Sequence, residues 1–200
     1  MLIRKYVFFI ALASLLTISC TSQKGKKLSE QEIISFRNQG DEITTRAQNT
    51  LLANVSAAMQ KAGPDYAVEF CNLEVSGIMD SLVSGKEYSI SRISEKNRNQ
   101  NNAPHNDDDR AILRSFLKAA QEGIMPADTL LMSKNNPIYY RPIMIGLETC
   151  LKCHGNPNSE IAPSTLAKID SLYPNDLAKG YSMKELRGAW KINFTSSESN

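Results

Sequence analysis

The stretch CLKCHG at residues 150–155 places two cysteines two residues apart and a histidine directly after the second cysteine. Three kinds of site use such a pattern: a thioredoxin-like redox motif, a zinc site and the attachment site of a c-type haem. A redox motif should follow a strand and start a helix, but glycine, asparagine and proline occupy residues 155–157, so no helix is expected to start there. Zinc sites normally take a second ligand pair at similar spacing, and the sequence lacks that pair.

Cys-x-x-Cys-His is the motif to which a c-type haem is attached. In such a site Cys150 and Cys153 form thioether bonds to two vinyl groups, and His154 is held beneath the iron as the proximal axial ligand. The chain has only 4 cysteines and 2 histidines, so a chance match to this motif is rare. The sequence therefore favours haem over the other two readings and predicts one covalently attached haem.

The start of the chain predicts export, which agrees with haem attachment outside the cytoplasm. Residues 1–19 have the pattern of a signal peptide, because Arg4 and Lys5 precede an apolar run that is too short for a transmembrane helix. The run ends in a sequence that resembles the lipobox of bacterial lipoproteins, although Thr17 stands where the common pattern prefers leucine. We expect cleavage and lipidation at Cys20; the alternative is an ordinary signal peptide that contains a cysteine.

The segment after the expected cleavage site has the composition of a tether. Residues 20–27 are polar and basic, and residues 28–200 are long enough for one domain with a single core. No acidic residue follows Cys20 at once. By resemblance to lipoprotein sorting in Gram-negative bacteria, this favours a lipid anchor in the periplasm, at the outer membrane.

The charge balance of the expected mature chain argues against nucleic-acid binding. The full chain has 23 Lys and Arg against 21 Asp and Glu, and removal of the signal peptide takes away Arg4 and Lys5, which makes the mature chain formally neutral. No basic stripe with interleaved aromatic residues is present. We therefore expect the membrane to be reached through the lipid alone.

Hydrophobic periodicity predicts an α+β fold. Few strands are expected, with long helices before and between them. The expected elements are one long helix or two over residues 28–62, a helix over 65–83, a strand over 88–94, a helix over 107–122 capped by aspartate and ended by Gly123, a strand over 137–147, a helix over 163–171 and a strand over 188–194.

Cys71 is the one cysteine that neither the lipidation site nor the haem motif uses. It lies on the apolar face of the expected 65–83 helix, in line with Ala67 and Val75. Unpaired cysteines on such faces are often ordinary core residues. The alternative is that Cys71 supplies the sixth ligand of a buried haem, and spacing alone does not decide between the two.

Other side chains compete for the distal axial position. Methionine ligates the iron of many electron-transfer cytochromes, but methionine in an apolar setting is more often core filler. His105 lies in a polar turn, where a solvated histidine is expected. The methionines in question are Met59, Met79, Met125, Met132, Met144 and Met183.

Four stretches, in this order, resemble a single-haem c-type family with a PAS-like fold and Cys/His axial ligation. They are AVEFCNLE (67–74), YSISRISEKNRNQNNAPHNDD (88–108), YYRPIMIGLETCLKCHG (139–155) and YPNDLAKGYSMKELRGAW (173–190). The resemblance runs from about Tyr66 to Trp190, which is most of the expected mature chain. Members of that family occur alone or attached to bacterial signalling proteins.

The resemblance implies a small antiparallel PAS-like sheet with the haem against it. It also implies that Cys150 and Cys153 anchor the haem, that His154 is the proximal ligand and that Cys71, from an upstream helix, is the distal ligand. In one departure, Gln100 follows an Arg-Asn pair where the family usually has proline. This departure affects the loop and leaves the ligands in place.

Three arginines in the family-like stretches are candidates for binding the haem propionates. They are Arg92, Arg98 and Arg141, and arginine is suited to two-point contacts with carboxylates. Tyr139 and Tyr140 could pack on the porphyrin. Surface salt bridges and core aromatic packing are equally good interpretations of these five residues.

Two classes of function follow from a haem with both axial positions occupied. Such an iron has no open position for a substrate, and the sequence has no other catalytic motif, so an enzyme is not expected. One hypothesis is a redox or small-gas sensor in which Cys71 leaves the iron and signals to a partner. The other is a membrane-tethered single-electron carrier that serves a redox partner. Residues 28–62 could also pair two copies as a homodimer.

Overall fold

The computed structural model describes residues 27–133 and 136–195. The predicted signal peptide, Cys20 and nearly all of the predicted tether therefore lie outside the described residues. The elements in chain order are α1 (Glu30–Leu73), α2 (Val75–Val83), β1 (Tyr88–Ile93), the short 3₁₀ helix η1 (Gln100–Asn102), α3 (Asp107–Gln121), β2 (Thr129–Ser133), β3 (Asn136–Met144), α4 (Glu148–His154), α5 (Pro163–Leu172) and β4 (Leu186–Phe194).

Four antiparallel strands form one sheet in the order β1-β4-β3-β2. The α+β prediction with a small antiparallel sheet is therefore confirmed. The sequence analysis missed β2, which pairs with β3 through a hairpin. It also missed α4. The first five residues of CLKCHG lie in this short helix, and Gly155 is its C-cap.

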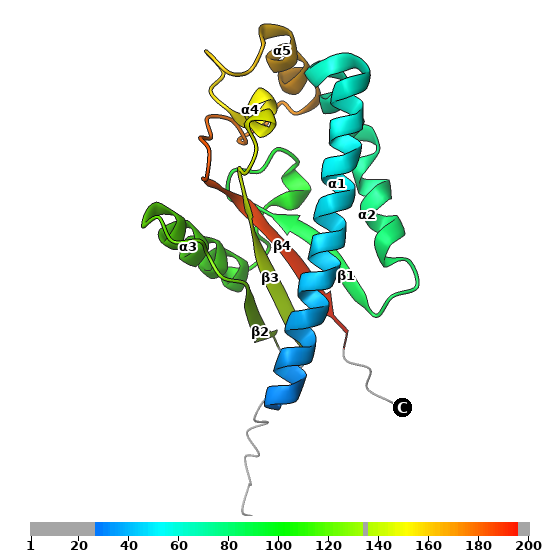
Figure 1. Cartoon of the computed structure of the whole chain (residues 1–200), viewed down its shortest axis with the longest axis vertical. Helices are drawn as coiled ribbons and strands as arrows, with labels where there is room; N and C mark the ends of the chain where they lie inside the picture. Colours follow the sequence, from blue (N-terminus) through cyan, green and yellow to red (C-terminus); the bar gives the residue numbers. More distant parts are fainter. Residues whose placement is uncertain (1–26, 134–135, 196–200) are drawn as a thin grey trace, which may run out of the picture.

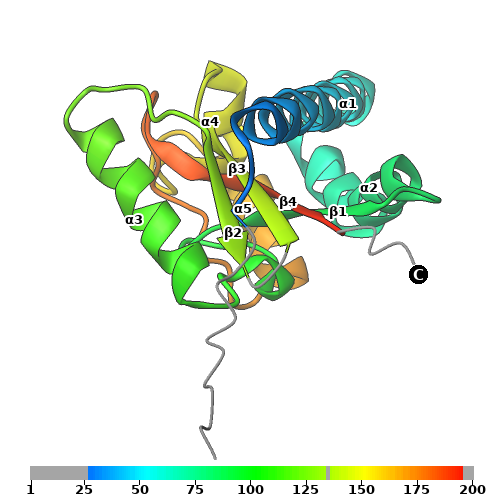
Figure 2. The ribbon, with the colours of Figure 1, turned by 90° about the horizontal axis from the view of Figure 1, so that it is seen from below.

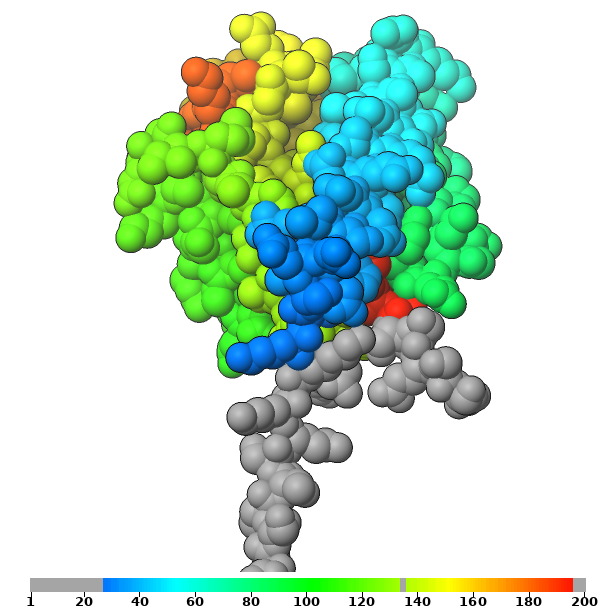
Figure 3. Space-filling view, turned by 60° about the horizontal axis from the view of Figure 1, so that its bottom comes forward, coloured from blue at the N-terminus to red at the C-terminus, as the bar shows by residue number. Residues whose placement is uncertain are grey.

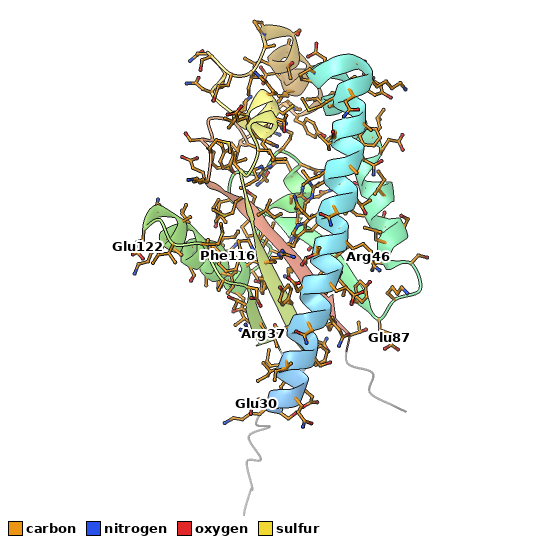
Figure 4. The ribbon with its side chains drawn as sticks, in the orientation of Figure 1. Glu30, Arg37, Arg46, Glu87, Phe116 and Glu122 are labelled. Atoms are coloured by element: carbon orange, nitrogen blue, oxygen red, sulfur yellow. The ribbon has the colours of Figure 1, made fainter. Side chains whose placement is uncertain are left out.

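Helices cover both faces of the sheet (Figures 1 and 2). Successive residues of β3 point to opposite faces, so Tyr139 packs toward α1 with Ile43 and Tyr140 packs toward α3 with Phe116. Figure 4 shows Phe116 on the sheet side of α3 and Glu122 at the far end of that segment. These two tyrosines are core residues between the sheet and its helices, as one of the two interpretations from the sequence had it.

A side chain caps the start of helix α3, and hydrogen bonds between buried polar groups join the helix to the sheet. The side chain of Asn106 accepts a hydrogen bond from the Asp109 amide, so the predicted helix is confirmed but its cap is asparagine and not aspartate. The Asp109 carboxylate accepts 2.8 Å hydrogen bonds from the Tyr140 hydroxyl and from the Lys191 ammonium. All three side chains are buried.

Helix α1 is long and interrupted. A capping box between Ser29 and Glu32 starts it, and Gly40 lets it lie directly on the ring of Tyr139, because a β-carbon there would fall 2.4 Å from the ring. Ala62 and Gly63 have non-helical backbone angles, so the segment from Pro64 onward is a separate helical piece. The predicted 65–83 helix is likewise divided, between Leu73 of α1 and Val75 of α2.

The C-terminal half of α1 meets α4 and α5 at one end of the molecule, at the top of Figure 1. Figure 3 shows the other half of α1 lying across the middle of the opposite end, between the α3 side and the α2 side. Within the described residues, no helix combines the length and the apolar character that a membrane span needs.

A pocket between helix α1 and the CLKCHG helix

A pocket opens where the C-terminal half of α1 approaches α4 at one end of the sheet. Its α1 wall is apolar and includes Leu51, Leu52 and Val55, and Ile143 and Ile145 close it from β3 and the turn that follows. All three cysteines of the described chain and the histidine of CLKCHG line this same pocket. The fold therefore brings together the four residues that the sequence analysis assigned to the haem.

Helix α4 is held in place from both sides by its own cysteines. Cys153 packs on the apolar cluster around Val68 of α1 and Ile169 of α5, and Cys150 packs on the cluster around Ile145 and Tyr181. Burial raises the pKa of Cys153 to about 11, against the lowering effect of the nearby Arg98. The thiol is therefore protonated at neutral pH. Because the thiolate is the form that reacts with oxidants, the protonated thiol is protected from oxidation.

His154 is oriented by a backbone carbonyl. Its Nδ1 lies 2.8 Å from the carbonyl oxygen of Ala178, and a carbonyl can only accept, so Nδ1 must carry the proton. Burial and the positive charges of Arg187 and Arg98 hold the pKa of His154 well below its usual range. The imidazole is therefore neutral at pH 7, and Nε2 is left with a free lone pair.

Neutral imidazole with Nδ1–H bound to a carbonyl is the usual state of a histidine that ligates a metal through Nε2. The ring of Tyr181 stands edge-on to that of His154, with the centroids 6.3 Å apart, and restricts its rotation. Helix α4 and the 178–181 segment are also joined along the backbone, because Tyr181 donates to the His154 carbonyl at 2.9 Å. The histidine is thus prepared for a ligand on its pocket side.

Cys71 enters the pocket from the last two turns of α1. Burial raises the pKa of its thiol, while the guanidinium groups of Arg92 and Arg98 act in the opposite direction. Two backbone breaks flank it, at Ala62–Gly63 before and at Glu74 after. Cys71 therefore lies on a short helical piece from Pro64 to Leu73, which the irregular backbone at Ala62–Gly63 and at Glu74 separates from the neighbouring helices.

The structure narrows the choice of distal side chain. Met59 and Met144 line the pocket, as Cys71 does. The remaining methionine candidates do not line it, and Met125 and Met183 are exposed. His105 is also exposed and lies outside it, as expected.

The three arginines proposed from the sequence have three different surroundings. Arg141 does not line the pocket; it forms a salt bridge with Asp41 at 3.0 Å and also contacts Thr45, which agrees with the alternative interpretation of a surface salt bridge. Arg98 lines the pocket, but its guanidinium pairs with Asp176 through two 3.2 Å hydrogen bonds. Arg92 remains in the pocket, with its guanidinium 5.8 Å from the ring of Trp190.

Arg187 is a pocket residue that the sequence analysis missed. Its guanidinium donates to the Ser94 hydroxyl and the Lys96 carbonyl, both at 3.0 Å. Among the described residues, neither Arg92 nor Arg187 forms an ion pair with a carboxylate. The signal was available, since Arg187 lies in the last family-like stretch, at the start of β4.

The arginine pair makes the pocket suitable for an anion. Burial lowers the pKa of both guanidinium groups, which nevertheless stay charged at neutral pH. Two positive charges without a carboxylate partner inside an apolar pocket match a flat apolar ligand that carries two carboxylates. Elsewhere in residues 27–133 and 136–195, no cluster of three or more carboxylate, imidazole or thiol groups could hold a bare metal ion.

Two comparisons with known proteins give a match, one with a family model and one with a solved structure. The family model described as Tll0287-like matches residues 23–195. The crystal structure of the cyanobacterial heme-protein Tll0287 superposes with a TM-score of 0.64 at 19% sequence identity, over 86% of this chain and 100% of that one. No curated protein matches in sequence. The structural match establishes a shared fold.

Proposed function

The chain belongs to the Tll0287-like family, and from this premise we propose that it is a c-type haem protein that carries one haem. Cys150 and Cys153 bind the haem covalently, His154 is the proximal ligand and Cys71 is the distal ligand. The single observation that carries the proposal is the convergence of these four residues, from two helices far apart in the sequence, on one pocket.

The residues present fit such a group. The free Nε2 of His154 and the thiol of Cys71 supply one nitrogen and one sulfur donor, and the α1 wall supplies the apolar surface that a porphyrin needs. Arg92 and Arg187 supply the positive charges for two propionates. The structure with the shared fold is that of a heme-protein, which supports haem binding by this chain.

Haem, when bound, supplies a one-electron couple between ferric and ferrous iron. A thiolate donor stabilises the ferric state, so Cys71 lowers the reduction potential. The nearby Arg92 partly offsets the thiolate charge, and α1 excludes water from it. Since protein side chains fill both axial positions, the proposal is a binding and redox function and not an enzymatic one.

We propose a redox or small-gas sensor over an electron carrier. The supporting observation is the position of Cys71 on the helical piece bounded by Ala62–Gly63 and Glu74, which can shift without unwinding the rest of α1. If Cys71 held the iron of a bound haem, reduction would weaken that bond, and carbon monoxide or nitric oxide would compete with Cys71 for the same position. Release of Cys71 would then let the piece from Pro64 to Leu73, which packs on α5 through Val68, shift at the Ala62–Gly63 break.

The location and the partners of the chain are part of the same proposal. Export, lipidation at Cys20 and a place at the outer membrane follow from the N-terminal sequence pattern. The half of α1 before the break exposes Ile33 and Ile34 outside the pocket, so a second copy could pack against it. A membrane-anchored dimer would let movement of Cys71 reach a signalling protein through α1.

An optical redox titration of the full chain, matured in a host that attaches c-type haem, tests the proposal. Spectra are recorded in both oxidation states, with and without carbon monoxide. The sensor is supported by a thiolate charge-transfer feature in the ferric state that disappears on reduction, together with binding of carbon monoxide by the ferrous protein. A six-coordinate haem that is unchanged on reduction and refuses carbon monoxide would support the electron carrier instead.

A further inference from the structure

Arg98 connects three parts of the chain at the base of α4. Its Nη2 atom donates to the carbonyl of Cys153 at 2.6 Å and to the carbonyl of Ala178 at 3.3 Å. Its Nε and Nη2 atoms also donate to the two oxygens of Asp176, at 3.2 Å each. The Asp176 side chain is fully buried and in turn accepts from the Ala178 amide at 2.8 Å.

The carbonyl of Ala178 is shared by two donors. It accepts from Nδ1 of His154 at 2.8 Å and from the guanidinium of Arg98 at 3.3 Å. A guanidinium that bonds to this oxygen draws electron density from it and makes it a weaker acceptor for the imidazole proton. Arg98 therefore acts on His154 without touching it.

We propose that Arg98 is a positioning residue that sets the orientation and the donor strength of His154 through the Ala178 carbonyl, with Asp176 as its counter-charge. This inference rests on the proposed function, in which His154 is the proximal ligand. It replaces the role in propionate binding that the sequence analysis gave to Arg98, because the fork of the guanidinium is already occupied.

The two members of the ion pair affect the reduction potential with opposite sign. Oxidised iron carries one more positive charge than reduced iron, so a nearby positive charge raises the potential and a nearby negative charge lowers it. Removal of the Arg98 charge also makes the Ala178 carbonyl a stronger acceptor, and a more strongly bound Nδ1–H makes His154 a better donor to ferric iron. Both effects of that removal lower the potential.

The test compares Arg98→Gln, Arg98→Lys and Asp176→Asn in the haem-loaded full chain. Arg98→Gln should lower the potential by about 59 mV, which is a tenfold change in the one-electron equilibrium constant. Arg98→Lys keeps the positive charge and should shift the reduction potential less. Its ferric EPR lines should broaden, because the forked guanidinium group no longer fixes the orientation of the His154 imidazole. Asp176→Asn keeps an oxygen for the Ala178 amide and should raise the potential.

Arg110→Gln is the matched control, because Arg110 pairs with the exposed Asp107 on α3, outside the pocket. It should leave the potential and the EPR spectrum unchanged. If Arg98 had only a structural role, its replacement would reduce haem loading. The reduction potentials of Arg98→Gln and Asp176→Asn would then not shift in opposite directions. Equal potentials in the wild type, Arg98→Gln and Asp176→Asn, or shifts in the same direction, would overturn the inference.

A second readout does not need loaded haem. In the haem-free full chain, NMR should show the proton on Nδ1 of His154 in both the wild type and Arg98→Gln, and the Nδ1–H proton resonance of Arg98→Gln should lie further downfield because its hydrogen bond to the Ala178 carbonyl is stronger. An Nδ1–H resonance that is unchanged or shifted upfield in Arg98→Gln would count against the inference. Failure of the wild type to attach haem would instead contradict the proposed function, so the two failures are distinguishable.

Discussion

Nδ1 of His154 lies 2.8 Å from the carbonyl oxygen of Ala178, which comes from the loop before β4. This one contact decides which nitrogen of the imidazole can bind metal, because the proton on Nδ1 leaves Nε2 free. It also joins His154 to Ala178, and nothing in the sequence around CLKCHG indicates that these two residues are neighbours.

Replacement of Cys153 by alanine should prevent the second thioether bond. We expect the yield of covalently attached haem to fall by about tenfold, because one thioether bond retains the porphyrin less well than two. Mass spectrometry of the purified chain, with haem staining after denaturation, measures the yield. Cys71→Ala is the matched control and should keep the haem attached. An unchanged haem mass in Cys153→Ala would contradict the covalent site.

Cys71→Ala should change the optical spectrum and raise the reduction potential, because it removes the thiolate that stabilises ferric iron. Met59→Leu and Met144→Leu, at the two methionines that line the same pocket, should leave the spectrum unchanged. Absorption and EPR spectra of the three variants in the ferric state make the comparison. If a methionine variant changes the spectrum and Cys71→Ala does not, then that methionine is the distal ligand.

Gly63→Ala should destabilise the helical break in α1. Gly63 has φ 78° and ψ −174°, a region that side chains with a β-carbon avoid, and we expect a loss of about 1–3 kcal/mol in the free energy of unfolding. Gly77→Ala is the control. Gly77 is exposed within α2 and a β-carbon there meets nothing, so helix propensity should make that variant slightly more stable. Urea denaturation measures both, and equal stability of the two variants would rule out strain at Gly63.

Asp109 should make stability depend on pH in the acid range. Burial alone would raise the pKa of Asp109, but hydrogen bonds from Lys191, Tyr140 and the His105 amide outweigh burial and lower it. A lowered pKa in the folded state contributes stability that is present above the unfolded pKa of about 3.9 and is lost as the pH falls through the folded pKa. Denaturation at pH 7 and pH 3 should show this loss.

Asp109→Asn isolates that contribution. At pH 7 the variant leaves the Lys191 ammonium buried without its carboxylate, which should cost about 3–5 kcal/mol. Asp107→Asn, on the exposed first turn of the same helix, is the control and should cost little. The acid sensitivity below pH 4 should be smaller in Asp109→Asn than in the wild type. Equal sensitivity would mean that another carboxylate carries it.

Local patterns in the sequence accounted for the elements whose residues repeat regularly. The α3 helix and the β1, β3 and β4 strands lie where periodicity placed them, because a half-buried element must repeat its apolar residues at its own period. The hairpin strand β2 and the helix α4 were missed. Both are short, and their conformations depend on pairing with β3 and on packing under α1 and α5.

The candidate site divides in the same way. The sequence drew attention to Cys150, Cys153 and His154 because the attachment motif consists of residues close together in the chain, and the structure places all three at the pocket. The arginines were predictable only in part: Arg92 and Arg98 line the pocket, although Arg98 pairs with Asp176, whereas Arg141 pairs with Asp41 of α1 and the pocket residue Arg187 was missed. Long side chains pair with whichever carboxylate packing brings near, and spacing in the sequence carries no information about that.

The sequence by itself determined the α+β class, the attachment motif and its histidine, because spacing along the backbone is enough to specify each of them. Only the tertiary structure decided that Cys71, Met59 and Met144 share the pocket while the other distal candidates do not, and that the Ala178 carbonyl orients His154. Those relationships join segments distant along the chain. They exist because burial of apolar surface brings α1, α4 and the loop before β4 together at one end of the sheet.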